Sequence, residues 1–245
     1  GVWGDCKETL PMLTKLVESK VYPKWVNKFK EHQEEELKEV IHEELNPSTD
    51  ILTMGEVIRN LNELTGGDAI IVTDVGQHQM VTCRYAKFNQ SRSNVTSGGL
   101  GTMGFGLPAA IGAKFGAQDR TVIAVIGDGG IQMTIQELGT IMQTGVDVKI
   151  MILNNQFLGM VRQWQQLFHE KRYSFVDITS PDFVAVAKGY YIDGQKVSER
   201  SKLKEALQTM LNHNGSYLLE VMVGKENNVF PMVPQGCSVS EIRLK

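Results

Sequence analysis

Several features that would restrict function are scarce or missing in this sequence. Only three cysteines, Cys6, Cys83 and Cys237, occur in 245 residues, and they are too widely spaced for a paired metal-binding motif. Their odd number and spacing favour buried or incidental thiols in a reducing cytoplasm over a disulfide framework. No apolar run approaches the roughly 20 residues of a membrane-spanning helix, and no signal-peptide pattern opens the chain. We therefore expect a cytoplasmic protein without a membrane partner.

The sequence also lacks an excess of charge of either sign. The formal net charge is −3, with 25 Lys and Arg against 28 Asp and Glu, and no basic stretch indicates nucleic acid as a partner. A Walker-type Gly-Lys-Ser/Thr loop is absent, which argues against a magnesium–nucleotide domain. Apolar content of 42% and charged content of 22% are typical of globular proteins. The length suits one large domain or two small ones.

From residue 51 onward, strand-like and helix-like apolar patterns alternate. Continuous apolar runs predict strands at 69–75, 121–126, 148–153, 190–192 and 217–223. Helical patterns lie before and between these runs, at 53–64, 78–87, 106–115, 131–143, 157–169, 181–189 and 198–213. This alternation predicts an α/β fold with a doubly wound, mostly parallel sheet and helices on both faces.

The first 50 residues differ in character. A short helix is predicted at 5–19, and the segment 27–45 is dense in Glu and Lys with a narrow apolar stripe, as in a solvated surface helix. Pro47 and Ser48 interrupt the pattern, so we place a boundary near residue 50, between 1–50 and a main domain at 51–245. Because the chain starts without an initiator methionine, we expect it to be a piece of a longer protein.

Two predicted strands end in residues suited to a magnesium–diphosphate site. The first is followed by Asp128 and the second by Asn155, 27 positions later, which fits a strand, a crossover helix and a parallel strand. Magnesium prefers oxygen ligands, and these side chains offer a carboxylate and an amide oxygen. The backbone carbonyl of Phe157 is a third candidate ligand. Gly129 and Gly130 allow a phosphate to approach the backbone closely. Two unrelated turns remain the alternative.

Three further clusters allow more than one interpretation. The segment 74–79 follows a strand and is either a diphosphate-binding loop or a solvated helix start. The segment 97–106 holds five glycines and Met103, which is either core filler or an apolar support for a flat ring. Met160 and Trp164 share a helix face and are either core residues or part of a substrate channel.

Taken together, these segments resemble the C-terminal, thiamine diphosphate-binding domain of acetohydroxyacid synthase, also called acetolactate synthase. The similarity covers most of the chain. It is carried by short motifs at separated places, namely Val75–Met80, Thr96–Gly104, Ile152–Asn155, Gly159–Val161, Gln163-Trp164, Arg172-Tyr173, Pro181–Phe183 and Pro231–Pro234.

The resemblance implies specific roles in binding thiamine diphosphate and Mg²⁺. Asp128, Asn155 and the Phe157 carbonyl match the magnesium ligands. Met103 matches the residue that supports the bent cofactor. The remaining matches surround the diphosphate or the pyrimidine ring, and they are Gly76, Gln77, His78, Gly101, Gly129, Gly130, Gly159 and Met160.

The implied reaction is carboligation. A thiamine diphosphate-dependent carboligase decarboxylates pyruvate and joins the two-carbon unit to a second 2-keto acid, pyruvate or 2-ketobutyrate. The products, 2-acetolactate and 2-aceto-2-hydroxybutyrate, begin branched-chain amino-acid biosynthesis. Met160 and Trp164 match the substrate channel, and Trp164 matches the residue associated with 2-ketobutyrate preference.

The resemblance also implies what lies outside this chain. Residues 1–50 resemble the end of the family's middle domain and its linker, and the family's activating glutamate lies in an N-terminal domain. FAD is therefore expected only in a full-length parent, which would be a homodimer or larger, with a possible regulatory subunit. We expect the chain alone to be inactive. Gly129-Gly130 and Leu158 depart from the family, which often has Ala-Ser and Gln there.

Two rival functions remain open from the sequence. One is another thiamine diphosphate-dependent 2-keto acid decarboxylase or a catabolic acetolactate synthase. The other is a non-catalytic module that binds the cofactor or serves assembly. Trp164 and the Gln77-His78-Gln79 cluster favour the biosynthetic synthase.

Overall fold

A computed structural model describes residues 1–245 and contains one six-stranded sheet with the order β2-β1-β3-β4-β6-β5. Every neighbouring pair of strands is parallel. The strands are β1 Ile70–Thr73, β2 Asn94–Thr96, β3 Val122–Gly127, β4 Lys149–Asn154, β5 Asp193–Val197 and β6 Tyr217–Met222. The predicted α/β class with a parallel, doubly wound sheet is confirmed.

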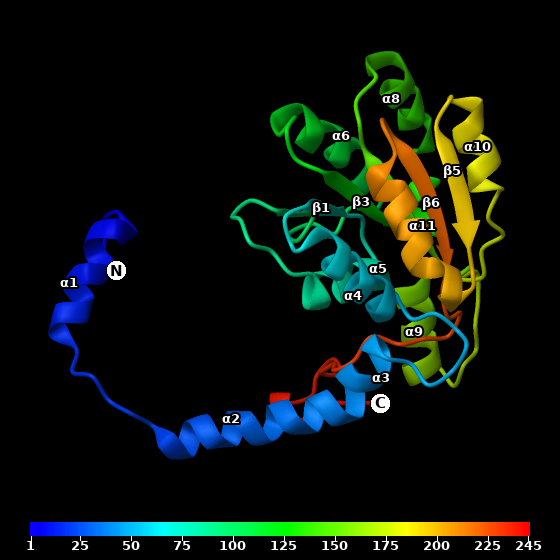
Figure 1. The fold of residues 1–245 in the computed structure, drawn as a ribbon. Helices are drawn as coiled ribbons and strands as arrows, with labels where there is room; N and C mark the ends of the chain where they lie inside the picture. The colour runs from blue at the N-terminus through cyan, green and yellow to red at the C-terminus, as the bar shows by residue number, and fades with distance from the viewer.

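Helices cover both faces of the sheet (Figure 1). One apolar cluster joins the sheet to α4 Met54–Thr65, α5 Gln77–Tyr85 and α11 Arg200–Asn212. A second cluster joins the other face to α6 Gly106–Gly116, α8 Leu138–Thr144 and α10 Phe183–Gly189. Side chains alternate along each strand, so Ile123 and Val125 enter the first cluster while Ala124 and Ile126 enter the second. Both faces of the central strands are thereby buried.

The structure differs from the predicted elements in three places. Strand β2 was not predicted, because it is short and partly exposed and has no apolar run. Strand β5 begins at Asp193, after the predicted 190–192, because this edge strand is largely polar. The predicted helix 131–143 is broken into α7 Asp128–Ile131, a 3₁₀ turn at Ile135–Glu137, and α8. The helical turn therefore begins at Asp128 itself.

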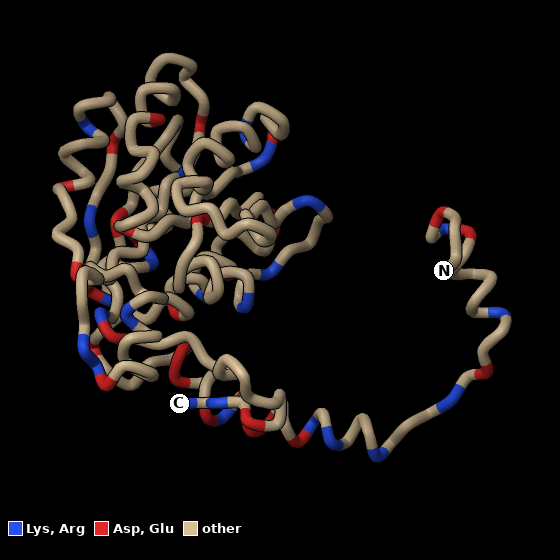
Figure 2. The backbone as a smooth tube through the Cα atoms, turned by 180° about the vertical axis from the view of Figure 1, so that it is seen from behind, with Lys and Arg blue, Asp and Glu red and all other residues tan.

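The N-terminal region comprises α1 Cys6–Leu16, α2 Pro23–Glu36, a π-helical turn at Leu37–Ile41 and α3 His42–Leu45. Helices α1 and α2 extend away from the sheet, whereas α3 packs against α4 (Figure 1). None of residues 1–36 is buried. The division near residue 50 stays a prediction. Figure 2 shows acidic and basic residues mixed along α2 and over the domain.

Two features of the whole chain bear on the expectations above. The three cysteines are free, and they are exposed rather than buried. No helix is both long enough and apolar enough to cross a membrane.

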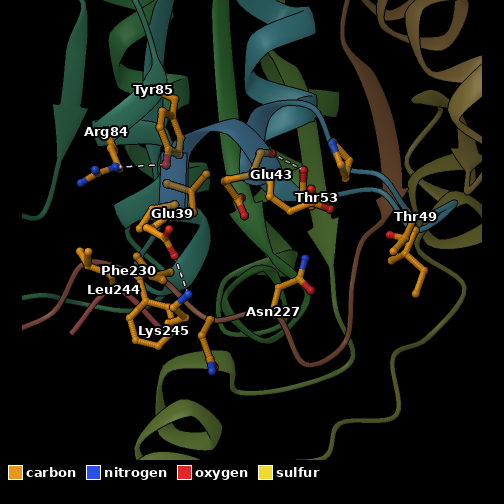
Figure 3. A pocket seen from close by; sticks show the side chains of 17 residues that line it. Glu39, Glu43, Thr49, Thr53, Arg84, Tyr85, Asn227, Phe230, Leu244 and Lys245 are labelled. Carbon is orange, nitrogen blue, oxygen red and sulfur yellow. Dashed lines mark hydrogen bonds and ion pairs between the residues drawn. The ribbon is translucent and has the colours of Figure 1, made fainter. Parts of the chain in front are cut away.

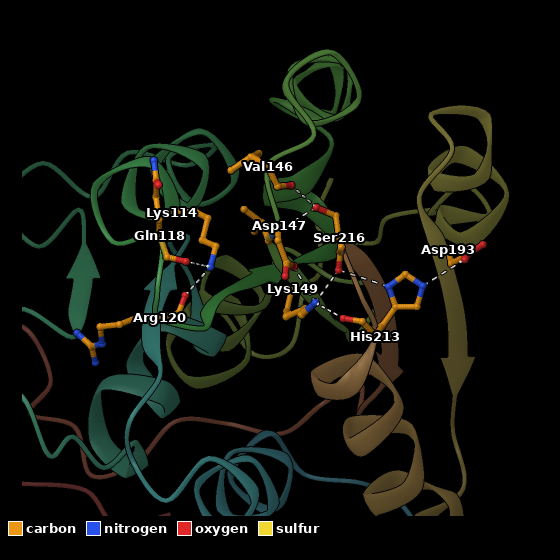
Figure 4. A network of polar contacts seen from close by, with 11 residues as sticks. Lys114, Gln118, Arg120, Val146, Asp147, Lys149, Asp193, His213 and Ser216 are labelled. Atoms are coloured by element: carbon orange, nitrogen blue, oxygen red, sulfur yellow. Dashed lines mark hydrogen bonds and ion pairs between the residues drawn. The ribbon is translucent and has the colours of Figure 1, made fainter.

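The N-terminal ends of the strands are held by a buried lysine (Figure 4). Lys149, at the start of β4, is 4% exposed. Its Nζ donates to Asp147 Oδ1 at 2.7 Å and to the carbonyls of His213 at 2.8 Å and Gly215 at 2.6 Å. This network ties β4 to the end of α11 and the start of β6, at the sheet edge opposite the polar strand ends.

Candidate functional site

The loops after β1, β3 and β4 meet at one edge of the sheet. The chain passes from β1 to β2 on one side and then returns to β3 on the other, so the strand order reverses beside β1. In open parallel sheets, ligands bind beyond the carboxyl ends of the strands at such a reversal. A small cavity of about 40 Å³ lies there. It is lined by ten of the predicted residues, namely Gly76, Gln77, His78, Met103, Asp128, Gly129, Gly130, Asn155, Phe157 and Gly159.

Asp128 lies directly after β3 and is 1% exposed. Burial raises the pKa of its carboxyl to about 6, because the charged form loses hydration. The Ser180 hydroxyl, which donates to Asp128 Oδ2 at 3.1 Å, opposes that rise. The backbone N–H groups of Asn155 and Gln156 also act to lower the pKa of Asp128. The carboxylate is therefore beside the turn that follows β4.

That turn presents the other two candidate ligands. Asn155 Oδ1 accepts from the Phe157 N–H at 3.2 Å, and Asn155 Nδ2 donates to Gln77 Oε1 at 3.1 Å. Between them, Gln156 has φ of 57°, a left-handed conformation that is uncommon for a residue with a side chain. The Phe157 carbonyl accepts no hydrogen bond, so its oxygen can bind a cation.

Gln77 holds Asn155 in place. Its Nε2 donates to Gln163 Oε1 at 3.0 Å and to the Asn227 carbonyl at 2.9 Å, while its Oε1 accepts from Asn155. Gln163 in turn exchanges hydrogen bonds with the backbone of Val229. The side chain of Gln77 thus pairs with protein groups, and it links the start of α5 to α9 Gly159–Phe168 and the C-terminal segment.

His78 offers an unpaired polar atom to the cavity wall. Burial lowers the pKa of its imidazole to about 4, although the nearby charge of Asp74 acts to raise it. The ring is therefore neutral at neutral pH. Its Nε2 is buried without a hydrogen-bond partner. The ring lies against Gly127, where an added Cβ would be 2.9 Å from His78 Nδ1.

Asp74 organises the glycine-rich segment, a role that its sequence pattern alone does not indicate. This fully buried carboxylate accepts from the N–H groups of Gly104 at 3.1 Å and Gly106 at 2.8 Å. It also contacts Gly130, where an added Cβ would lie 2.3 Å from Asp74 Oδ1. Its position directly after a strand was the available signal. Asp74 thereby joins the segment that carries Met103 to helix α7.

Three predicted site residues lie outside the cavity. Gly101 is exposed, with φ of 63°. Met160 is partly buried and packs against the first apolar cluster. Trp164 is 38% exposed, and its ring lies 5.0 Å from that of Phe168. Their assigned roles stay predictions.

The donor set of the cavity fits a magnesium–diphosphate group. Asp128 supplies one carboxylate, and the amide oxygen of Asn155 and the carbonyl of Phe157 are neutral oxygens. No group of three His, Cys, Asp or Glu side chains elsewhere is placed to hold a metal. Magnesium usually takes few protein ligands and completes its shell with phosphate oxygens and water. The unpaired Nε2 of His78 and the uncovered backbone of Gly129 suit a phosphate.

A larger cavity, of about 420 Å³, lies elsewhere, and the two cavities share no lining residue (Figure 3). It lies between residues 39–53, the end of α5 and residues 227–230. Its wall includes Glu44, where burial raises the pKa to about 7. None of the predicted chemistry depends on this cavity.

Comparison with known proteins assigns the family. Residues 74–221 match the family described as "Thiamine pyrophosphate enzyme, C-terminal TPP binding domain". The chain belongs to this family of thiamine pyrophosphate enzymes. The matched segment begins at Asp74 and contains Asp128, Asn155 and Phe157, so the cavity residues contributed by β1, β3 and β4 all lie within it.

Individual relatives show which enzymes of this family the chain is similar to. The chain is 45% identical over 190 residues to the acetolactate synthase isozyme 2 large subunit of Escherichia coli (strain K12), covering 77% of this chain and 35% of the relative. It is 39% identical over 251 residues to acetolactate synthase 1, chloroplastic, of Nicotiana tabacum, covering 98% and 38%. The predicted resemblance to acetohydroxyacid synthase catalytic subunits is confirmed. The chain spans little more than a third of these thiamine pyrophosphate enzymes.

Proposed function

We propose that this chain forms the cofactor-holding part of a carboligase of the acetolactate synthase type. The observation that carries the proposal is the meeting of Asp128, Asn155 and the free Phe157 carbonyl at one strand-order reversal. Membership of the thiamine pyrophosphate enzymes and the printed names of the relatives support it.

In this proposal, Asp128, Asn155 and the Phe157 carbonyl hold Mg²⁺, and the metal holds the diphosphate of thiamine diphosphate. The glycine backbone and the Nε2 of His78 hydrogen-bond or contact the diphosphate. When bound, the cofactor would supply a nucleophilic thiazolium carbon and a cationic ring that serves as the electron sink for decarboxylation and carbon–carbon bond formation. The protein groups named here position the cofactor.

The substrates proposed are pyruvate and 2-ketobutyrate, giving 2-acetolactate and 2-aceto-2-hydroxybutyrate. Trp164 lies on the exposed side of α9, one turn and a half beyond Gly159 in the cavity, and we assign it to a substrate channel completed by other parts of the protein. Exposed apolar side chains such as Trp3, Leu13 and Trp25 suit contact with further domains or a second subunit. The assembly proposed is a homodimer or larger, with FAD held elsewhere in the parent.

The first test is calorimetric titration of the 245-residue chain with thiamine diphosphate, with and without Mg²⁺. Magnesium-dependent binding is expected, and Asp128→Ala should abolish it because the carboxylate ligand is lost. Asp119→Ala is the matched control, since Asp119 is an exposed carboxylate just before β3 while Asp128 lies just after it. Binding of thiamine diphosphate that does not depend on Mg²⁺ would exclude the proposed metal site. An equal loss of affinity in Asp128→Ala and Asp119→Ala would exclude it as well.

A second test concerns the reaction. The complete product of the gene should convert pyruvate to 2-acetolactate. Release of acetaldehyde in its place would identify a decarboxylase, and the absence of either product would favour a module that binds the cofactor without catalysis.

A further inference from the structure

Strand β6 carries a buried carboxylate that the proposed chemistry does not use. Glu220 is 1% exposed on the sheet face covered by α8 and α10. Its Oε1 accepts from Asn154 Nδ2 at 2.7 Å and from Lys196 Nζ at 3.2 Å, while its Oε2 has no partner. A buried charge is costly unless it is paired and hydrogen-bonded. The position of Glu220 therefore calls for a physical reason.

Asn154 connects this carboxylate to the metal-binding turn. It is the last residue of β4 and immediately precedes Asn155. Glu220 lies opposite Ile152 in the parallel register, which puts its side chain on the same face as that of Asn154. Asn154 Oδ1 accepts from the backbone N–H of Gln156 at 3.0 Å. One amide side chain thus touches both Glu220 and the turn.

The partners of Asn154 fix its orientation. An ionised carboxylate only accepts hydrogen bonds and a backbone N–H only donates them, so Nδ2 must face Glu220 and Oδ1 must face Gln156. The charge of Glu220 strengthens the first bond. The second bond holds Gln156 at its left-handed φ of 57°, between Asn155 and the Phe157 carbonyl.

We propose that Glu220 is a positioning residue that, through Asn154, fixes the Asn155–Phe157 turn for magnesium. This inference rests on the proposed function, because it concerns the same metal site. The rival role is purely structural, a buried ion pair with no effect on the turn. Glu56 provides the comparison, since it too is buried, is paired with one cation at 2.7 Å, that of Arg200, and leaves its Oε2 without a partner.

The first readout needs no metal. In the metal-free 245-residue chain, amide hydrogen exchange at Gln156 is expected to be faster in Glu220→Met and Asn154→Ala than in the unaltered chain. Exchange at Ala124 in the centre of β3 should stay unchanged. A general loss of structure would accelerate both amides together, and that result would overturn the proposal. If Glu220→Met does not fold, Glu220→Leu, which also removes the acceptor for Asn154 Nδ2, serves in the same comparison.

The second readout is the affinity for Mg²⁺ at saturating thiamine diphosphate. Partners that orient metal ligands typically change metal affinity by about 10- to 100-fold when removed, so Glu220→Met should weaken binding by about 10-fold. Glu220→Gln should stay closer to the unaltered chain, because its amide oxygen can still accept from Asn154. The double variant of Glu220→Met and Asn154→Ala should bind no more weakly than Asn154→Ala alone, because Glu220 acts through Asn154.

The controls separate this inference from the proposed function. Glu56→Gln should lower stability without changing the affinity for Mg²⁺. Loss of binding in Asp128→Ala with unchanged affinity in both Glu220 variants would overturn the positioning role alone. The positioning role would also be overturned if the loss of Mg²⁺ affinity in the double variant equalled the sum of the losses in Glu220→Met and Asn154→Ala. If Asp128→Ala keeps magnesium-dependent binding, or if the unaltered chain shows none, the metal site itself is overturned and the positioning role with it.

Discussion

The Ser180 hydroxyl donates to Asp128 Oδ2 at 3.1 Å, and it is the one side chain that donates to this carboxylate. Ser180 belongs to the loop before α10, so this bond joins that loop to the candidate ligand. Burial raises the pKa of Asp128 to about 6, and the Ser180 bond opposes that rise because it favours the ionised carboxylate. The hydroxyl therefore helps to keep the ligand charged near neutral pH.

Magnesium binding is accordingly expected to weaken as the pH falls through about 6, where Asp128 gains a proton and loses its capacity to bind the metal. Ser180→Ala should move this decline to higher pH and weaken binding by up to about fivefold at pH 5, the equivalent of one net hydrogen bond. Calorimetric titration with Mg²⁺ and thiamine diphosphate from pH 5 to 8 measures both effects. Ser174→Ala removes an exposed hydroxyl from the same loop and should match the unaltered chain. If Ser180→Ala leaves the pH dependence of Mg²⁺ binding unchanged, the role assigned to the Ser180 hydroxyl is contradicted.

The same pKa predicts how stability depends on pH without metal. The pKa of Asp128 is about 6 in the folded chain, above its ordinary value of 3.8, so the folded chain binds the proton more tightly than the unfolded chain. This tighter proton binding by Asp128 stabilises the folded chain. The stabilisation is complete below pH 3.8 and is lost as the pH rises through 6. Asp128→Asn should therefore raise the free energy of unfolding by about 2–3 kcal/mol at pH 8. Urea unfolding with a chelator tests this, and an equal gain at pH 3.5 would contradict it.

The sequence predicts the centre of the site well because local and global signals agree there. Apolar strands followed by Asp128 and Asn155 predict a parallel pair, and parallel pairing necessarily brings the two residues to one edge. The order of β1, β3 and β4 then places the loop at Gly76 beside them. These relations depend only on strand direction, which the alternation of strands and helices already indicates.

Other parts depend on contacts that no local pattern contains. The polar atoms of Gln77 pair with Gln163 and Asn227, which lie 86 and 150 positions away. Strands β2 and β5 lie at the sheet edges, where polar residues are tolerated and the apolar signal is lost. The break between α7 and α8 likewise depends on how the chain packs after Asp128.

The two glycines after Asp128 are expected to respond differently to an added methyl group. At Gly130 a Cβ would lie 2.3 Å from Asp74 Oδ1, so Gly130→Ala must displace the carboxylate that binds Gly104 and Gly106. At Gly129 the atoms nearest to an added Cβ would be the flexible ends of the Leu158 and Ile178 side chains, at 3.0 and 3.1 Å.

Gly130→Ala should therefore lower the free energy of unfolding by about 3 kcal/mol, through the lost hydrogen bonds and the overlap. Gly129→Ala should cost about 1 kcal/mol or less. Thermal unfolding of the two metal-free variants side by side measures the difference. Equal destabilisation would show that the Asp74 contact does not govern this segment.

Replacement of Lys149 is expected to lower the stability of the fold without changing the binding of magnesium and thiamine diphosphate. Lys149→Met leaves the carbonyls of His213 and Gly215 and the Asp147 carboxylate without their shared donor, at the buried edge of the sheet (Figure 4). The expected loss is about 2–4 kcal/mol in the free energy of unfolding, less than for a fully enclosed pair because Asp147 is partly exposed. Urea unfolding against Lys188→Met, which removes an exposed and unpaired lysine, measures it.

Binding of magnesium and thiamine diphosphate by the folded Lys149→Met variant should be unchanged, because β4 separates Lys149 from Asn154 by roughly 16 Å. A stability equal to that of Lys188→Met would show that the network contributes little, and weakened binding would show that the two ends of β4 are coupled.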